Sequence, residues 1–538
     1  MSVPPPQADS TDVGRPSYTY RLANPGDPPQ VTVVTRVAGE PGCFGETARS
    51  LQRQSFQQWE WLIAVDEARR VEVSSAIGDD PRIRVVDDLG VALVATRAPY
   101  VLLLAEGDQL EPTALEKWIW VLVTHPRRTS VGRVASCSHE TGPVGANRGT
   151  GIPEIDIGYP MGWTGVIRRE TLEANRGRRG ALPSPRLPRR RRRSRIRLDA
   201  PSNRLAKESR RVLFLVPWVT TGGADKFTID VVQQLAARGW EVTVVTTLAG
   251  DNCWLSRVER VTPDVFALPE LLPASAFPGF LRYLVGARRP DVILVSNSQF
   301  AYRALPFMRL SAPRVAVVDY CHSVVEGWLD GGYPRLSVDG RDHLDLHITS
   351  SEDLKNWMVA RGVERDRIEV CYVGTTPSSR SSGGSREGLG LPDGVPLVLY
   401  PCRLTHEKQP AVFARTLLAL RDEQVSFHAA VVGDGPYLEW LESFVRENRL
   451  TNSVTFTGAV SNEHVRELMA AGDCVFLPSK FEGISVVLYE ALAEGVPVVG
   501  ADVGGQRELV SPDCGRLIEP GSQSEEVRRY TAALRELL

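Results

Sequence analysis

The chain has 538 residues, too many for one hydrophobic core, and its 42% hydrophobic and 24% charged residues are typical of an ordinary globular protein. Its 63 basic and 65 acidic residues nearly cancel, so the overall charge predicts no nucleic-acid partner. The eight cysteines are scattered without a Cys-x-x-Cys pair, which argues against a zinc or disulfide framework and predicts reduced thiols in a cytoplasmic protein. The proline-rich start lacks a signal peptide's apolar core, and no apolar run approaches the ~20 residues that span a bilayer. Peripheral contact with the inner face of the cell membrane remains open as a prediction.

The first half of the chain changes composition twice. Residues 1–30 are rich in proline and polar side chains and are predicted to be disordered. Residues 31–175 alternate apolar strands with helices and predict an α/β domain. We expect strands over 31–35, 59–65, 100–104 and 162–169, and helices over 46–54 and 112–123. Residues 176–209 are dominated by arginine, proline and glycine; such dense like charges repel, so an exposed linker is expected, with contact to nucleic acid or anionic lipid as the alternative.

Two more α/β regions are predicted, over residues 210–378 and 395–538, with a linker rich in serine, glycine and arginine at 379–394. We expect their clearest strands over 211–216, 241–245, 291–295, 315–318, 396–400 and 474–478. Apolar strands alternating with helices are typical of parallel, doubly wound sheets. Because such sheets bind ligands beyond the carboxyl ends of their strands, the loops after these strands are where a site is expected.

The loop after strand 474–478 carries the most informative residues. Glu482 and Glu490 are eight positions apart in a stretch of helical composition, so we expect both carboxylates on one helix face, about 12 Å apart along the axis. Gly483 at the helix start exposes backbone amides that suit an anion such as a diphosphate. One ligand with a hydroxyl-rich head, a phosphate middle and a ribose tail would match these features. Two solvated carboxylates on a helix surface are the alternative.

The stretch from Glu482 to Glu490 resembles the Glu-x7-Glu signature of retaining GT-B glycosyltransferases of family 4. Further matching motifs follow in family order at 433–436, 456–458, 478–479, 494–499 and 504–508. The resemblance covers about residues 211–538 and implies two facing Rossmann-like domains and a nucleotide-sugar donor. It implies that Glu482 binds sugar hydroxyls with backbone amides near Gly483, Ile484 and Ser485, and that Glu490 binds the ribose. It assigns no protein nucleophile, because the leaving phosphate oxygen helps to deprotonate the acceptor.

Two other loops resemble those of the same family. Gly222 and Gly223, after strand 211–216, resemble its Gly-Gly-Ala loop and let a helix start approach phosphate closely, although an ordinary turn is the alternative. His322, after strand 315–318, resembles the family's histidine beside the transferred sugar; a structural histidine is the alternative.

Arg403 and Lys408 follow strand 396–400 and resemble the family's Arg-Leu-x-x-Glu-Lys motif. Arg403 can bind the leaving nucleoside diphosphate bidentately, while Lys408 acts as a point charge. Together they stabilise its developing negative charge without a metal ion or any other cofactor. Cys402 and Gln409 stand where the family usually has glycine, which leaves the shape of this loop open.

Residues 50–66 resemble the start of a GT-A glycosyltransferase of family 2. In that family an Asp-x-Asp pair after the next long strand holds a divalent cation. Here Ala105 and Gly107 occupy the expected positions, and Glu106 and Asp108 are one residue out of register. We therefore predict that this GT-A-like domain is degenerate and inactive, with a role in acceptor binding or interaction.

The sequence thus predicts an α/β protein, a GT-B pair of Rossmann-like domains preceded by a GT-A-like domain, of bacterial origin. The predicted function is retaining transfer of a sugar to a glycan, lipid-linked or polysaccharide-precursor acceptor. A sugar-nucleotide epimerase on the same fold and a non-catalytic binding or scaffold protein are the alternatives. The nucleotide, the sugar, the acceptor and the oligomeric state stay open.

Overall fold

The computed structural model describes residues 18, 20–38, 42–124, 130–134, 163–170, 203–375 and 386–538. Contacts between Cα atoms divide the chain into two compact units. The first unit contains residues 1–220, 228–293 and 306–315, and the second contains residues 221–227, 294–305 and 316–538. In the parts of the chain that the structure describes, no helix is both long enough and apolar enough to cross a bilayer.

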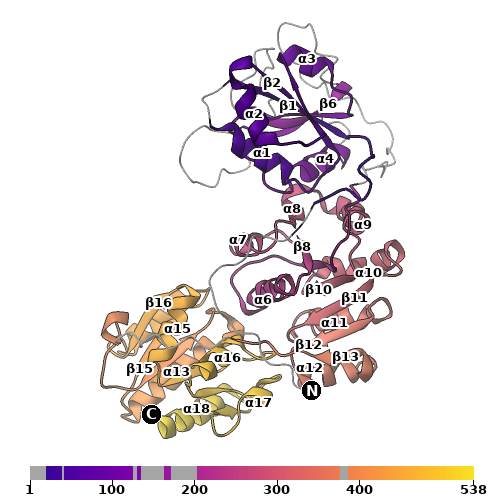
Figure 1. The fold of residues 1–538 in the computed structure, drawn as a ribbon. Helices are drawn as coiled ribbons and strands as arrows, with labels where there is room; N and C mark the ends of the chain where they lie inside the picture. The colour runs from indigo at the N-terminus through magenta and orange to yellow at the C-terminus, as the bar shows by residue number, and fades with distance from the viewer. Residues whose placement is uncertain are drawn as a thin grey trace, which may run out of the picture. The chain divides into compact units, whose positions relative to one another are not determined.

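The amino-terminal sheet, in the indigo part of Figure 1, has six strands, and their order is β3-β2-β1-β4-β6-β5. Strands β1 to β4 are parallel, whereas β6 runs antiparallel to both β4 and β5. The strands are β1 (Val31–Val37), β2 (Trp59–Val65), β3 (Ile83–Val86), β4 (Tyr100–Leu103), β5 (Ser130–Val134) and β6 (Trp163–Arg168), and the helices are α1 (Phe44–Gln52), α2 (Arg70–Ile77), α3 (Leu89–Val94) and α4 (Ala114–Thr124).

Alternate residues of these strands enter two separate cores, because successive strand side chains point to opposite faces of a sheet. Val33 and Trp61 belong to the core that also contains Leu115 of α4, while Val34 and Leu62 belong to the core on α3. Both faces of the amino-terminal sheet are therefore covered, as the near-continuous apolar strands require.

The second sheet has seven strands in the order β13-β12-β11-β10-β7-β8-β9. The pairs β7–β8, β8–β9, β11–β12 and β12–β13 are all parallel. Its strands are β7 (Arg211–Val216), β8 (Glu241–Thr246), β9 (Val265–Ala267), β10 (Val292–Ser296), β11 (Ala316–Cys321), β12 (Leu346–Thr349) and β13 (Ile368–Val370). Its helices are α6 (Gly223–Ala237), α7 (Leu255–Glu259), α8 (Leu268–Leu271), α9 (Phe277–Arg288), α10 (Gln299–Ser311), α11 (Tyr333–Asp339) and α12 (Glu352–Val359).

The carboxyl-terminal sheet is parallel throughout, in the order β16-β15-β14-β17-β18-β19. Its strands are β14 (Leu397–Pro401), β15 (His428–Val432), β16 (Val454–Gly458), β17 (Cys474–Leu477), β18 (Val498–Ala501) and β19 (Gly515–Ile518). Its helices are α13 (Pro410–Asp422), α14 (Leu438–Glu447), α15 (Asn462–Ala471), α16 (Val486–Ala493), α17 (Gln506–Leu509) and α18 (Gln523–Leu537). The predicted strands begin within one residue of the observed ones, and the prediction of parallel α/β sheets is confirmed.

Three predicted boundaries are wrong where a side chain anchors the backbone. Tyr18 is buried and residues 20–30 are ordered, so the prediction of disorder fails there; its remainder lies outside the described residues. In the predicted linker 176–209, Asn203 and Leu205 are buried. In the predicted linker 379–394, Arg386 donates to the Ala471 carbonyl and the Asp473 carboxylate, which fixes the segment after residue 385 to the carboxyl-terminal domain.

Candidate active site

The residues predicted for the donor site all lie in the second unit, in or beside loops at the carboxyl ends of parallel strands. His322 follows β11, Arg403 and Lys408 follow β14, and Glu482 follows β17. Strands β14 and β17 are neighbours, so their loops leave the sheet side by side. This is the edge at which open parallel sheets bind ligands.

The loop between β17 and α16 differs from the prediction. The helix begins at Val486, so Glu482 and Gly483 lie in the preceding loop and only Glu490 lies on the helix. The expectation of two carboxylates on one helix face is therefore wrong. The helix starts late because close contacts with two neighbouring loops hold the backbone at 482–484.

Glycines make these contacts possible. A Cβ atom on Gly483 would lie 1.9 Å from the carbonyl oxygen of His322, far inside van der Waals contact. Gly504, which has a φ of +54°, would place a Cβ 2.1 Å from the carbonyl oxygen of Glu482. The Gly505 amide donates to the Gly483 carbonyl at 2.7 Å. The loop after β17 is thus held between the loop after β11 and the turn at 504–505, as only glycine permits.

Lys408 donates a hydrogen bond to the Glu482 carboxylate and forms an ion pair with it. The two side chains are 20% and 12% exposed, so the pair is partly shielded from water. Burial opposes the charge on Lys408, but the neighbouring Glu482 carboxylate outweighs this effect and raises the pKa of the lysine. The structure thus brings together a cation and a carboxylate predicted from separate motifs.

Arg403 lies beside the glycine loop that precedes α6. Its guanidinium donates to the Thr221 carbonyl at 2.6 Å, and a Cβ on Gly222 would lie 3.7 Å from the same nitrogen. Gly223 is the first residue of α6, and a Cβ there would lie 3.1 Å from the side chain of Val486. An exposed cation and two helix starts, those of α6 and α16, therefore meet at one place.

His322 is held as a neutral imidazole. Its Nε2 atom shares a hydrogen bond of 3.0 Å with the Ser296 hydroxyl at the end of β10. The rings of Phe227 and Tyr320 meet the imidazole edge-on, with centroids 5.0 and 4.7 Å away. Burial lowers the pKa of His322 to about 3, so the ring carries no charge near neutral pH.

Glu490 is buried on α16, with 8% of its surface exposed. It is four positions after Val486, so both side chains lie on the same face of the helix. Because Val486 packs against Gly223, the Glu490 carboxylate lies on the helix face that is turned toward the start of α6. Ile484 and Ser485 complete the predicted set. They lie in the chain between Glu482 and this helix, and both are buried.

The two departures from the family's glycines have different outcomes. Gln409 adopts the left-handed conformation that glycine readily takes, with a φ of +53°. Its side-chain amide donates to the Glu526 carboxylate at 3.1 Å. Cys402 lies so close to Gly433 that a Cβ atom on Gly433 would be 2.1 Å from the Cys402 carbonyl oxygen. Burial raises the pKa of the Cys402 thiol to about 12, which makes it a poor nucleophile.

Two residues at the site were not predicted. Ser296, which orients His322, follows an apolar strand in the polar run Ser296-Asn297-Ser298, a signal of the same kind as that used for the other loops. The Glu508 carboxylate accepts hydrogen bonds from the backbone amides of Glu352 and Asp353, both at 2.8 Å, and so caps the start of α12. Its only sequence signal was its place after Gly504 and Gly505.

The carboxyl end of β4, in the amino-terminal domain, is arranged differently. Glu106 pairs with Arg69 at 2.7 Å and accepts a hydrogen bond from the Ala38 amide at 3.0 Å. Arg69 also donates to Glu72. Asp108 is half-buried, and this burial raises the pKa of its carboxyl group. The carboxylate of Glu106, which lies between the two expected ligand positions in the sequence, is therefore already neutralised by an arginine of the same domain.

Parallel sheets covered by helices, with glycine, cation and carboxylate loops at the carboxyl ends of the strands, are typical of doubly wound α/β proteins that bind nucleotides. Two family models match this part of the chain: Glycosyltransferase Family 4 over residues 221–378, and Glycosyl transferases group 1 over residues 384–536. Residues 221–378 and 384–536 are therefore similar to glycosyltransferases of family 4 and of group 1, in agreement with the resemblance seen in the Glu-x7-Glu segment.

Individual relatives agree with this assignment. An uncharacterized glycosyltransferase of Methanocaldococcus jannaschii is 28% identical over 212 residues, which are 37% of this chain and 54% of the relative. Sulfoquinovosyl transferase of Arabidopsis thaliana is 25% identical over 234 residues, 43% of this chain and 42% of the relative. The chain thus spans about half the length of these curated relatives. The crystal structure of HepE from Anabaena in complex with UDP has a TM-score of 0.50 at 24% identity, over 61% of this chain and 90% of HepE, and shares the fold.

Proposed function

We propose that the protein is a retaining glycosyltransferase that moves a sugar from a nucleotide-sugar donor to a glycan or lipid-linked acceptor. The observation that carries this proposal is the ion pair between Lys408 and Glu482. It brings a cation and a carboxylate together from the loops of two neighbouring parallel strands. A nucleotide sugar needs both groups, because its diphosphate binds cations and its sugar hydroxyls bind carboxylates.

Arg403 and Lys408 would act on the leaving group. The exposed guanidinium of Arg403 can bind two phosphate oxygens at once, and the ammonium of Lys408 supplies a second positive charge. Negative charge builds up on the diphosphate as the glycosidic bond breaks, and fixed cations stabilise that state more than the ground state. The proposed reaction uses no metal ion or other cofactor.

His322 would bind the sugar as a neutral hydrogen-bonding group. Its pKa of about 3 leaves it unprotonated at neutral pH, and its Nε2 atom is already engaged by Ser296. It therefore orients a hydroxyl and does not supply charge. The proton of the acceptor would pass to the leaving phosphate oxygen on the same face of the sugar, which accounts for retention.

Glu482 and Glu490 would hold the two ends of the donor. Glu482, with the backbone amides of Gly483, Ile484 and Ser485, would bind the sugar hydroxyls, and Glu490 would bind the ribose. HepE, which shares the fold, was solved in complex with UDP, so UDP is the first nucleotide to test.

We propose further that the amino-terminal domain is a degenerate GT-A-like domain. Its strand order, with four parallel strands followed by the antiparallel strands β6 and β5, supports this proposal. The Arg69–Glu106 pair supports the loss of metal binding, because a cation would have to displace the guanidinium. Location in the cytoplasm or at the inner membrane face stays a prediction.

Turnover separates this function from its alternatives. The protein is incubated with UDP-, GDP- or ADP-sugars, with and without membrane and polysaccharide extracts, and free nucleotide and sugar are quantified by mass spectrometry. The proposal predicts nucleoside diphosphate release that rises with acceptor and disappears in Glu482→Gln. An isomerised sugar without acceptor would favour an epimerase, and no turnover by the folded protein with any donor would favour a scaffold.

A further inference from the structure

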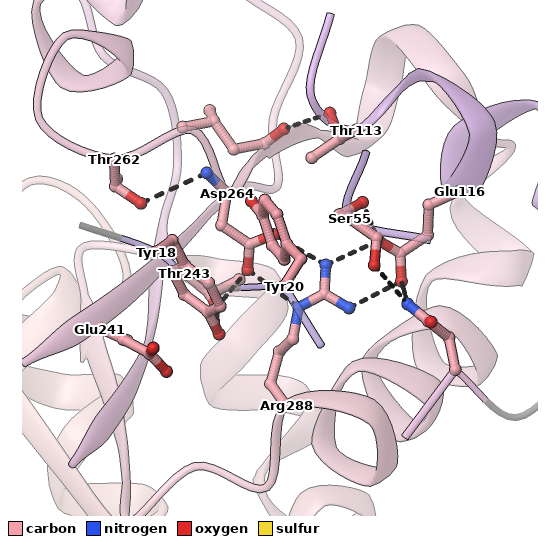
Figure 2. Close-up of polar contacts among 12 residues, drawn as sticks. Tyr18, Tyr20, Ser55, Thr113, Glu116, Glu241, Thr243, Thr262, Asp264 and Arg288 are labelled. Atoms are coloured by element: carbon pink, nitrogen blue, oxygen red, sulfur yellow. Dashed lines mark hydrogen bonds and ion pairs between the residues drawn. The ribbon is translucent and has the colours of Figure 1, made fainter. Parts of the chain in front are cut away.

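Arg288, the last residue of α9, lies at the centre of a buried ionic network in the first unit (Figure 2). Its guanidinium donates to both oxygens of Glu116, at 2.7 and 2.6 Å. It also donates to both oxygens of Asp264, at 2.9 and 2.7 Å. The arginine side chain is 1% exposed and both carboxylates are fully buried, so one cation serves two anions away from water.

The two carboxylates come from different domains. Glu116 lies in the first turn of α4, in the amino-terminal domain, whereas Asp264 lies just before β9, in the domain that follows residue 210. Each carboxylate has two further hydroxyl donors, one of which is a tyrosine. Tyr283 donates to Glu116 at 2.5 Å, and Tyr20 donates to Asp264 at 3.1 Å.

Two of the three central groups, Glu116 and Arg288, are held in their charged forms. Burial raises the pKa of Glu116, but the Arg288 guanidinium outweighs it, and the pKa ends below its usual range. Burial likewise opposes the charge on Arg288, and the carboxylates of Asp264 and Glu116 raise its pKa above normal. The helix dipoles act in the same direction, since Glu116 lies at the start of α4 and Arg288 at the end of α9.

Backbone and aromatic contacts surround this network. Asn203 accepts a hydrogen bond from the Gln57 amide at 3.0 Å and donates to the Ser55 carbonyl at 2.8 Å. Two residues on, the Leu205 amide donates to the Ala287 carbonyl at 3.0 Å. The ring of Trp120 on α4 meets Phe280 of α9 edge-on, with centroids 5.2 Å apart. Segment 203–205 thus bonds to both domains at once.

We propose that the domain after residue 210 has one fixed partner at the surface that carries Asp264 and Arg288. This partner is the amino-terminal domain of the same chain, and the two domains fold as an obligate unit that Arg288 holds together. A buried guanidinium between two carboxylates is stable only while both are present, because the loss of one leaves an uncompensated buried charge. The amino-terminal domain therefore has a structural role that does not depend on catalysis at the carboxyl end of β4.

Hydrogen exchange of the full chain tests the proposal. Glu116→Gln keeps the shape of the side chain but removes its charge, and the matched control is Glu111→Gln, whose surface pair with Lys117 lies next to the same helix. We expect Glu116→Gln to speed exchange on the order of tenfold or more in residues 265–288 as well as in 114–124, and the control to change neither. A change confined to residues 44–124 would overturn the proposal.

A measurement on the unmodified protein covers the case in which Glu116→Gln does not fold. Exchange is followed at increasing urea concentrations, and the midpoint at which each segment loses protection is compared. Residues 44–124 and 241–288 should lose protection at the same urea concentration. Separate midpoints for these two segments would show that the domains unfold independently and would contradict the proposal.

Discussion

The molecule contains two clusters of basic and acidic side chains that differ in their access to water. In the first unit, Arg288, Glu116 and Asp264 are 1%, 0% and 0% exposed. In the second unit, Lys408 and Glu482 are 20% and 12% exposed, and Arg403 beside the glycine loop is exposed. We therefore propose that similar ionic chemistry serves architecture in the sealed cluster and ligand binding in the more open one.

The two clusters differ in whether the chain's own carboxylates already occupy the hydrogen-bond donors of the cation. The guanidinium of Arg288 is bonded by two carboxylates that the chain itself supplies, so no ligand can reach it. The cations of the second unit lie in loops at the carboxyl ends of strands, where a diphosphate can approach them. A charged side chain that is perturbed but still accessible is the better candidate for function.

The largest effect should come from exchanging a cation for methionine in each cluster. Arg288→Met should lower the free energy of unfolding by about 3–5 kcal/mol, because two buried carboxylates lose their cation. Lys408→Met should lower it by less, about 1–2 kcal/mol, because Glu482 keeps some contact with water, but should slow turnover by roughly 10²–10³-fold. Urea denaturation and initial rates, measured on both variants, check this contrast. Equal stability losses would contradict the distinction between the clusters.

The packing of the loop after β17 gives the next largest effect. Gly483→Ala would place a methyl group 1.9 Å from the His322 carbonyl oxygen and should cost about 1–3 kcal/mol of stability while weakening donor binding. Gly374→Ala is the matched control, since a Cβ there meets nothing within 4 Å and its φ is not left-handed. Thermal unfolding and donor titration of both variants measure the difference. A harmless Gly483→Ala would show that the loop is not held as described.

The histidine of the open cluster predicts a pH dependence. The pKa of His322 is lowered from 6.5 to about 3 on folding, so its contribution to stability is complete above pH 6.5 and declines as the pH falls toward 3. Between pH 6.5 and 5.5 this amounts to about 1 kcal/mol. Urea denaturation at both pH values should therefore show a smaller decline for His322→Asn than for the unmodified protein. Equal declines would mean that the folded-state imidazole titrates normally.

The smallest effect is expected at the left-handed residue before α13. Gln409→Gly relieves the backbone strain at a φ of +53° but removes the hydrogen bond to Glu526. These terms are each about 1 kcal/mol and oppose one another, so the net change in stability should be below about 1 kcal/mol. Urea denaturation checks this, with Gln424→Gly, at a φ of +61°, as a left-handed control. A large loss would show that the Glu526 contact organises the loop.

The strands and the loops that follow them could be predicted from the sequence because apolar runs and post-strand motifs are local signals. The same signals place Glu482, Lys408 and Arg403 in such loops, and their role at a donor site stays a prediction. The helix after β17 starts four residues later than predicted because contacts to His322 and Gly504 hold the loop. The burial of Tyr18 and Asn203, in segments predicted to be disordered or exposed, could not be predicted. Their partners lie up to 225 residues away in sequence, and a local composition of proline, arginine and polar residues gives no sign of them.

Donor binding tests the central claim most directly. Thermal unfolding is measured with UDP-, GDP- and ADP-sugars for the unmodified protein and for Glu490→Ala. A donor at ~100 times its dissociation constant should stabilise the fold by about 2.7 kcal/mol. We predict stabilisation by one nucleotide that is lost in Glu490→Ala. Stabilisation that persists undiminished in Glu490→Ala, or none with any donor, would contradict a donor site in the second unit.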